Sequence, residues 1–106
     1  MTPEAMARCH ARAFAGQGRA WSSDEFSALL NSEHVFFRGD ARAFALGRVV
    51  ADEAELLTIA TDPGHRRTGL GAAVLSALEA AAIARGACRI FLEVAQDNGA
   101  ARALYA

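Results

Sequence analysis

The sequence contains no lysine, and arginine supplies all 11 of its basic side chains. A Walker-type phosphate loop needs a lysine to reach the phosphates, and a Schiff-base enzyme needs a lysine amine. Both chemistries are therefore excluded. An anion, if this protein binds one, must be held by arginine side chains and backbone amides.

Cysteine is scarce, and long apolar runs are missing. The two cysteines, Cys9 and Cys88, stand far apart without metal-type spacing, so no metal is predicted. The longest apolar stretch, 72–84, contains Ser76 and Glu79 and is shorter than the roughly 20 residues of a membrane span. The chain start has no leader pattern. We expect reduced thiols, a cytoplasmic location and no membrane contact.

The charge is nearly balanced, with 11 basic against 12 acidic residues and a net charge of -1. A nucleic-acid binder needs a basic stripe for phosphates, so no nucleic-acid partner is predicted. The two parts of the chain nevertheless differ. Residues 1–64 carry 6 arginines against 9 acids, whereas residues 65–106 carry 5 arginines against 3 acids. The second part suits an anionic ligand.

Two helices are predicted near the N-terminus. Thr2 followed by Pro3 is typical of a helix start, and glycines at 16 and 18 end that helix. A second helix begins at Ser22, where Glu25 completes a capping box, and it runs to about residue 31.

Three segments, 34–38, 42–50 and 55–61, are rich in β-branched and aromatic residues. Gly39-Asp40 and Asp52-Glu53 separate them and read as turns. The pattern predicts an antiparallel meander of three strands.

A long helix and a last strand follow. Apolar residues at helical spacing trace one face of the helix, which Gly86 closes: Leu70, Val74, Leu75, Leu78, Ala81 and Ala82. The apolar run 88–94 reads as a buried strand, with Cys88 in the core. Strand, helix and strand imply a parallel β-α-β crossover, so we expect an α/β fold with a mixed sheet in a single domain over residues 1–106. A final helix would begin near residue 97 or 98.

The segment 66–71, Arg-Arg-Thr-Gly-Leu-Gly, precedes the long helix. Unpaired amides and the helix dipole favour an anion there, and glycine lets a ligand approach the backbone. The alternative is that the glycines only shape a turn and the arginines are solvated; spacing alone does not decide between them. A dinucleotide-binding fold is disfavoured, because its third glycine is replaced by Val74 and its first should directly follow the strand.

Here the sequence resembles the GNAT family of acyl-CoA-dependent N-acetyltransferases. The family signature, Gln or Arg, two residues, Gly, one residue, Gly or Ala, is similar to residues 66–71, and the downstream 92–94, Asn98, Ala101, Leu104 and Tyr105 resemble the RimI-type branch. That branch acetylates protein N-termini, notably of a ribosomal protein. The resemblance implies acetyl-CoA as co-substrate and a protein or peptide N-terminus as acceptor.

The resemblance also implies roles for individual residues. The main chain of 59–61 would hold the acetyl and pantetheine portion, and the loop would hold the pyrophosphate. The residues so assigned to acetyl-CoA are Ile59, Ala60, Thr61, Arg66, Arg67, Thr68, Gly69, Leu70, Gly71, Ala72 and Asn98. Asn98 is equally well placed as a helix N-cap.

Two residues are candidates for proton transfer. Glu93 interrupts an apolar strand and, by period-two alternation, shares a face with Phe91. By itself it reads as a strand-end glutamate facing solvent; the resemblance makes it the general base. Tyr105 is the matching general acid for the leaving sulfur, and its alternative role is packing of the last helix.

We therefore expect an N-acetyltransferase. The alternatives are a non-catalytic acyl-CoA-binding module, an inactive fragment, or an enzyme for a small amine; an oligomer is possible. The chain ends one residue after Tyr105, and the resemblance implies that the family's usual C-terminal strands are missing.

Overall fold

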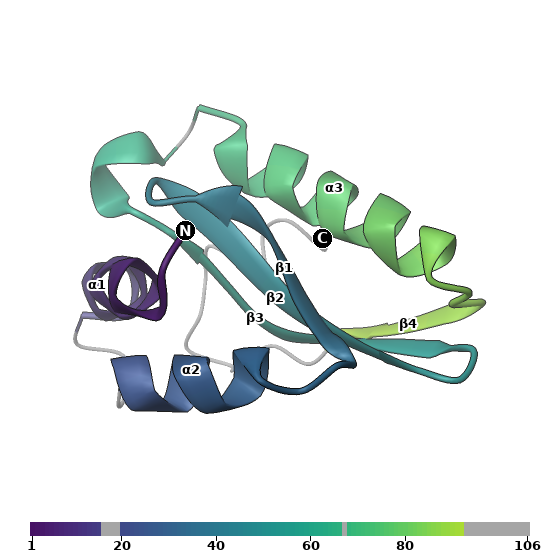
Figure 1. Ribbon diagram of the computed structural model, residues 1–106. Coiled ribbons are helices and arrows are strands. Elements are labelled where there is room, and N and C mark those ends of the chain that lie inside the picture. Colours follow the sequence, from purple (N-terminus) through teal and green to yellow (C-terminus); the bar gives the residue numbers. More distant parts are fainter. Residues whose placement is uncertain (16–19, 67, 93–106) are drawn as a thin grey trace.

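The computed structural model describes residues 1–15, 20–66 and 68–92. A mixed four-stranded sheet, in the order β1-β2-β3-β4, lies between helices (Figure 1). Its strands are β1 (Val35–Asp40), β2 (Ala43–Val50), β3 (Glu53–Thr61) and β4 (Arg89–Leu92). The first three form an antiparallel meander, and β4 runs parallel to β3. The predicted meander and parallel crossover are confirmed.

The two N-terminal helices, α1 (Pro3–Ala13) and α2 (Ser23–Leu30), begin where their capping residues predict. The Thr2 hydroxyl accepts the Ala5 N–H at 3.1 Å, and Ser22 with Glu25 forms a complete capping box. Such caps satisfy amides that the first helical turn leaves without partners. Both helices cover one face of the sheet (Figure 1).

The long helix α3 (Leu70–Ala84) covers the opposite face (Figure 1). Five of the six residues that the helical spacing predicts on its inner face are buried: Val74, Leu75, Leu78, Ala81 and Ala82. The sixth, Leu70, is partly buried against the same cluster. Gly86 follows the helix with φ +98, a conformation that glycine adopts at low cost. The core is thus two apolar clusters, one on each face of the sheet.

Both predicted turns are displaced by one or two residues. The strand β1 continues through Gly39 to Asp40, which pairs with Ala43, so residues 41 and 42 make the turn. Gly39 has φ +118, and a Cβ there would collide with the carbonyl oxygen of Ala43, so glycine serves a close approach of two strands. In the next hairpin Glu53 pairs with Val50, and residues 51 and 52 make the turn.

The prediction of a buried last strand is wrong for the described part of β4. Cys88 and Arg89 are exposed, and Phe91 is 51% exposed. Only Ile90 packs against the cluster beneath α3. The reason is position. Strand β4 is an edge strand of the described sheet, and α1 and α2 cover a part of the sheet away from β4 (Figure 1).

Candidate functional site

The candidate site lies where β3 ends and α3 begins. A short 3-10 helix, η1 (Pro63–His65), connects them. The Asp62 carboxylate accepts the Gly64 N–H at 3.0 Å and so caps this turn, and the Thr68 hydroxyl donates to the His65 carbonyl oxygen at 2.6 Å. These two side chains fix the path of the loop from β3 to α3.

The N-terminus of α3 has no side-chain cap. Gly69 is the N-cap residue, with φ +82, and the first helical hydrogen bond joins the Ala73 N–H to the Gly69 carbonyl at 3.0 Å. The amides of Leu70, Gly71 and Ala72 therefore lack helical acceptors. A Cβ built on Gly69 meets no atom within 4 Å, so the space beside this N-cap residue is open. This is the geometry that binds phosphate groups.

Arg66 turns toward α1 instead of toward the start of α3. Its Nη2 donates to the Ala13 carbonyl oxygen at 2.8 Å, at the C-terminal end of α1. The second arginine of the predicted pair, Arg67, lies outside the described residues. A carbonyl at a helix C-terminus is a favourable partner for a guanidinium, so Arg66 ties the loop to the N-terminal helix.

The end of β3 has an unpaired side among the described residues. Parallel pairing with β4 extends from Glu53, opposite Arg89, to Leu56, opposite Leu92. Beyond it Leu57 is an extra residue, because Leu46 pairs with Thr58 whereas Gly47 pairs with Leu56. Such a β-bulge bends a strand and interrupts its pairing.

The predicted cofactor residues Ile59 and Ala60 are 6% and 3% exposed, because each side chain packs into one of the two apolar clusters. The Ala60 carbonyl oxygen also accepts a hydrogen bond from the Cys9 thiol at 4.0 Å. Because the Asp62 N–H donates to the Arg42 carbonyl at 2.7 Å, strand alternation turns the main-chain groups of Ala60 toward β2 and those of Ile59 toward the strand edge. Thr61 is half-buried and pairs with Ala43 on the β2 side. The bulge was not predicted from the sequence. Its signal is the pair Leu56-Leu57, because two adjacent apolar residues break the alternation of apolar and polar side chains along the strand.

The remaining predicted site residues, Glu93, Asn98 and Tyr105, lie outside the described residues. The described part of β4 does establish the alternation on which the Glu93 prediction depends, with Ile90 against α3 and Phe91 on the other side. Their roles stay predictions.

A buried carboxylate beside the loop was not singled out from the sequence. Asp62 is 8% exposed, and its Oδ2 lies 3.2 Å from the Nε of Arg12. The signal was available, because Asp followed by Pro is typical of a capped turn. Asp62, like Arg66, links α1 to the loop. We call the end of β3, the loop and the start of α3, residues 59–72, the α3 corner, and these two contacts hold it against α1.

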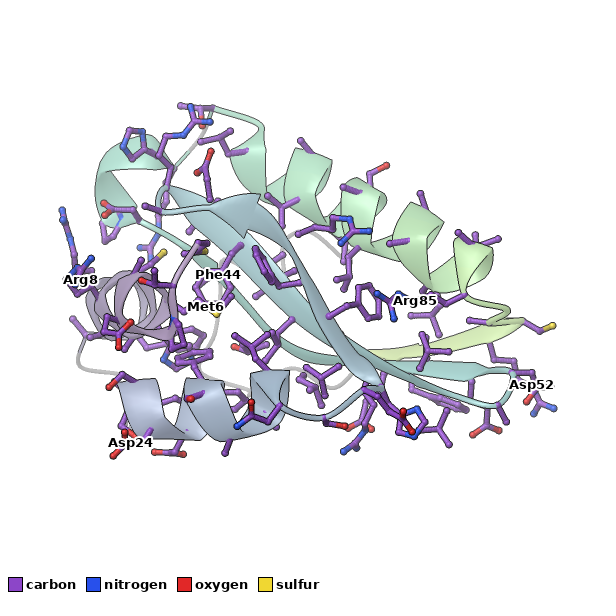
Figure 2. All side chains as sticks on the ribbon, viewed as in Figure 1. Met6, Arg8, Asp24, Phe44, Asp52 and Arg85 are labelled. Carbon is purple, nitrogen blue, oxygen red and sulfur yellow. The ribbon has the colours of Figure 1, made fainter. Side chains whose placement is uncertain are left out.

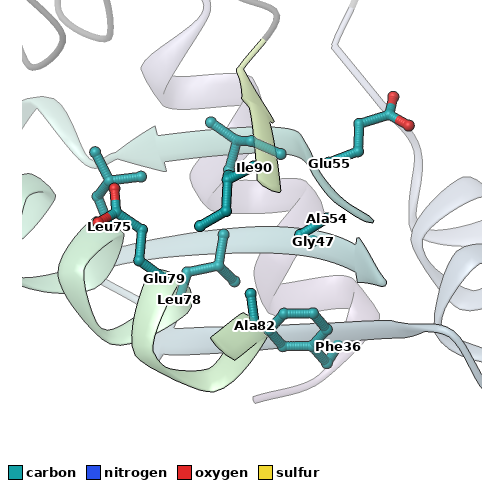
Figure 3. A pocket seen from close by; sticks show the side chains of 10 residues that line it. Phe36, Gly47, Ala54, Glu55, Leu75, Leu78, Glu79, Ala82 and Ile90 are labelled. Carbon is teal, nitrogen blue, oxygen red and sulfur yellow. The ribbon is translucent and has the colours of Figure 1, made fainter. Parts of the chain in front are cut away.

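The cavity between α3 and the sheet is not a ligand site. Leu75, Leu78 and Ala82 of α3 face Phe36 and Ile90 across it, while the Glu55 carboxylate points away (Figure 3). Its volume is about 10 Å³, which is at the limit for one water molecule. It is a small packing gap in the core.

Comparison with known proteins decides the family. The sequence profile of the Acetyltransferase (GNAT) family matches residues 5–106. The chain belongs to the GNAT family. It is 40% identical over 89 residues to the [Ribosomal protein bS18]-alanine N-acetyltransferase of Escherichia coli K12, an alignment that covers 80% of this chain and 60% of that protein. The chain thus spans less than two thirds of the length of that relative.

Solved structures agree with this GNAT assignment. The crystal structure of the ribosomal-protein-S18-alanine N-acetyltransferase from Escherichia coli matches with a TM-score of 0.81 and 37% identity, over 97% of this chain and 67% of that chain. An aminoglycoside acetyltransferase from an uncultured soil metagenomic sample matches with a TM-score of 0.74 and 15% identity, over 95% of this chain and 74% of that chain. At that identity the second match shows the fold alone.

Within residues 1–15, 20–66 and 68–92, no helix is long and apolar enough to cross a membrane. The same part of the chain has no cluster of histidine, cysteine and acidic side chains that could hold a metal ion.

Proposed function

We propose that this GNAT chain transfers the acetyl group of acetyl-CoA to the N-terminal α-amino group of a protein that begins with alanine. The observation that carries the proposal is the uncapped, glycine-lined N-terminus of α3 close to the end of β3, whose edge beyond Leu56 has no partner strand within residues 1–15, 20–66 and 68–92. The similarity in sequence and in structure to the ribosomal-protein S18-alanine N-acetyltransferase of Escherichia coli supports the acceptor.

The residues around this corner fit acetyl-CoA. The amides of Leu70, Gly71 and Ala72 would bind the pyrophosphate, with Arg67 adding charge. Gly69 and Thr68 shape the turn. The main chain of Ile59 and Thr61, which strand alternation turns to the edge on either side of Ala60, would hydrogen-bond the pantetheine arm. Arg66 contributes by holding the loop against α1, and Asn98 is proposed as a further contact.

When bound, acetyl-CoA supplies an activated acetyl thioester. The acceptor arrives mostly as an ammonium, since an α-amino group has a pKa of about 8. Glu93 would take the proton that the ammonium must lose before nitrogen attacks the carbonyl carbon. As the new C–N bond forms and the C–S bond breaks, Tyr105 would protonate the departing sulfur. On becoming an amide the nitrogen loses a second proton, which would restore the Tyr105 hydroxyl, and Glu93 would release its proton to water.

A second candidate is a non-catalytic acyl-CoA-binding module. The described residues assigned to acetyl-CoA, such as Leu70, Gly71 and Ala72 at the start of α3, would serve binding alone. Both candidates share the binding corner and differ in whether acetyl transfer occurs.

Binding is tested first, by thermal unfolding with and without acetyl-CoA. A ligand that binds only the folded state raises the melting temperature as its concentration rises. An unchanged melting temperature at millimolar acetyl-CoA would contradict both candidates.

Catalysis is tested by release of free thiol from acetyl-CoA in the presence of a peptide that begins with alanine. We expect Glu93→Gln to lower turnover by about 100-fold or more, since a general base contributes about 10² to 10⁴. Its melting shift with acetyl-CoA should persist. Binding without any thiol release from the unsubstituted chain would favour the module instead, and undiminished turnover in the variant would remove Glu93 from its role.

A further inference from the structure

A groove rich in arginine lies beside Asp62 and His65. Three arginines from two elements line one groove, Arg8 and Arg12 from α1 and Arg42 from the turn between β1 and β2, with His65 of η1 beside them. Figure 2 shows Arg8 on the outer side of α1, facing away from the sheet. None of the residues lining this groove belongs to the segment 68–72 at the start of α3.

Two of these guanidinium groups are oriented by carboxylates. The Nε of Arg12 lies 3.2 Å from Oδ2 of Asp62, which is itself fixed by the Gly64 amide. Arg42 donates from Nε and Nη2 to Asp40, at 3.2 and 2.8 Å to Oδ2. A carboxylate on one edge of a guanidinium leaves its remaining N–H groups directed elsewhere and reduces the entropy lost on binding an anion.

The groove keeps an excess of positive charge. Hydrogen bonds from the Arg42 side chain lower the pKa of Asp40 to about 2, so that pair is fully ionised at neutral pH. Burial, with the nearby Asp62 carboxylate, raises the pKa of the Cys9 thiol in the groove lining to about 11, so this thiol carries no charge. Arg8 has no ion-pair partner among the described residues. Three arginines are thus set against two carboxylates, Asp62 in the lining and Asp40 beside Arg42, so the unpaired Arg8 supplies the excess positive charge.

The size and the surroundings indicate the class of ligand. The groove volume is about 520 Å³, within the range of small-molecule sites. A long polyanion would extend past the groove onto a chain whose residues 1–64 contain 9 acidic side chains against 6 arginines, which disfavours it. We propose that this groove binds a phosphate group of a small molecule about the size of a mononucleotide, at a site separate from the α3 N-terminus.

The test is a titration of the isotope-labelled chain, followed by NMR of its backbone amides at constant ionic strength. Inorganic phosphate is the first probe and adenosine 5′-monophosphate the second. We expect saturable shifts at Arg8, Arg12, Arg42 and His65, with the nucleotide binding at least tenfold more tightly because it fills more of the groove. Shifts confined to residues 69–72, or no saturation with either probe, would overturn the proposal, as would equal affinity for both.

The variants separate the groove from general charge effects. The double substitution Arg12→Gln with Arg42→Gln should weaken nucleotide binding at least tenfold. The double substitution Arg48→Gln with Arg89→Gln removes an equal charge outside the groove, from an arginine that pairs with Glu55 and an exposed one on β4, and it should leave binding unchanged. Equal loss in both variants would show a non-specific charge effect and contradict the site. Thermal unfolding with acetyl-CoA is the independent readout for the α3 corner, so failure of one proposal leaves the other standing.

Discussion

His10 is a buried imidazole in an aromatic cluster between α1 and α2. Its ring stacks on those of Phe14 and Trp21, with ring centroids 4.3 and 5.3 Å away. Its Nδ1 accepts a hydrogen bond from the backbone N–H of Trp21 at 3.3 Å. Burial lowers the pKa of His10 to about 4, against a smaller opposing effect from the Glu25 carboxylate. The neutral form is therefore the one that the fold accommodates.

This environment predicts a pH dependence of stability. The unfolded chain binds a proton on His10 below about pH 6.5, whereas the folded chain binds it only near pH 4. The stabilisation is complete above pH 6.5 and is lost as the pH falls toward 4, by about 3 kcal/mol over that window. Urea unfolding at several pH values measures it.

The control for His10 is a variant that cannot titrate. His10→Phe keeps an aromatic ring, so its free energy of unfolding should fall less between pH 6.5 and 4 than that of the unsubstituted chain. Ile83→Ala, at an exposed position, removes no titratable group and should leave the pH profile as it was. Parallel profiles for the original chain and His10→Phe would contradict the assignment.

Arg66 predicts a stability effect that is independent of any ligand. Its hydrogen bond to the Ala13 carbonyl joins the loop to the end of α1. Arg66→Ala should lower the free energy of unfolding by about 1 kcal/mol without acetyl-CoA present, because that carbonyl loses a charged donor. Arg89→Ala, an exposed arginine on β4, should change it by less than about 0.5 kcal/mol. An unaltered urea midpoint in Arg66→Ala would mean that the contact contributes nothing.

Two glycines at opposite ends of α3 separate backbone strain from ligand binding. Gly69 and Gly86 both have positive φ, +82 and +98, and a Cβ on either meets no atom within 4 Å. Substitution by alanine at either position should cost about 1 kcal/mol of stability, because an L-residue is strained there. Only Gly69→Ala should also weaken acetyl-CoA binding, since strain at this N-cap residue would shift the amides that are proposed to bind the pyrophosphate.

Calorimetric titration of both variants with acetyl-CoA gives the comparison. Gly86→Ala is the matched control, with the same kind of strain at the far end of the helix. Equal acetyl-CoA affinity in Gly69→Ala and Gly86→Ala would place the pyrophosphate away from the start of α3.

The helices could be predicted from the sequence because their signals are local. Thr2, Ser22 and Gly86 act within one turn of their own position, and the buried face of α3 follows from spacing alone. The strands depend on partners. Gly39 is typical of a turn, yet it lies within β1. Glycine is needed there because the carbonyl oxygen of Ala43 in the next strand comes too close for a side chain. The bulge at Leu57 likewise exists only in relation to β2.

The same distinction holds at the candidate site. The motif at residues 66–71 predicted a glycine-rich loop before a helix, and in the structure Gly69 begins α3 without a side-chain cap. The contact of Arg66 with Ala13 joins residues 53 positions apart, so no local pattern indicated it. Local chemistry was predictable, whereas the partner of a long side chain was not.

At the scale of the whole molecule, the two apolar clusters share one sheet. Strand β2 contributes Ala45 to the cluster under α3 and Phe44 and Leu46 to the cluster under α1 and α2. Because neither face can lose its packing without exposing the same strand, we expect the described part of the chain to unfold as one cooperative unit.

Leu78→Ala tests this cooperativity from the far side of the sheet. Leu78 is 4% exposed beneath α3, and its loss should cost about 3 kcal/mol through the cavity it leaves. The single tryptophan, Trp21, packs against the opposite cluster, so its fluorescence reports on α1 and α2. If the faces are coupled, the fluorescence and far-ultraviolet circular dichroism transitions should move together to lower denaturant. Ile83→Ala, 64% exposed on the same helix, should move neither. A fluorescence midpoint that stayed in place while the dichroism midpoint fell would mean that the α1–α2 face unfolds independently, because only the packing beneath α3 would then have been lost.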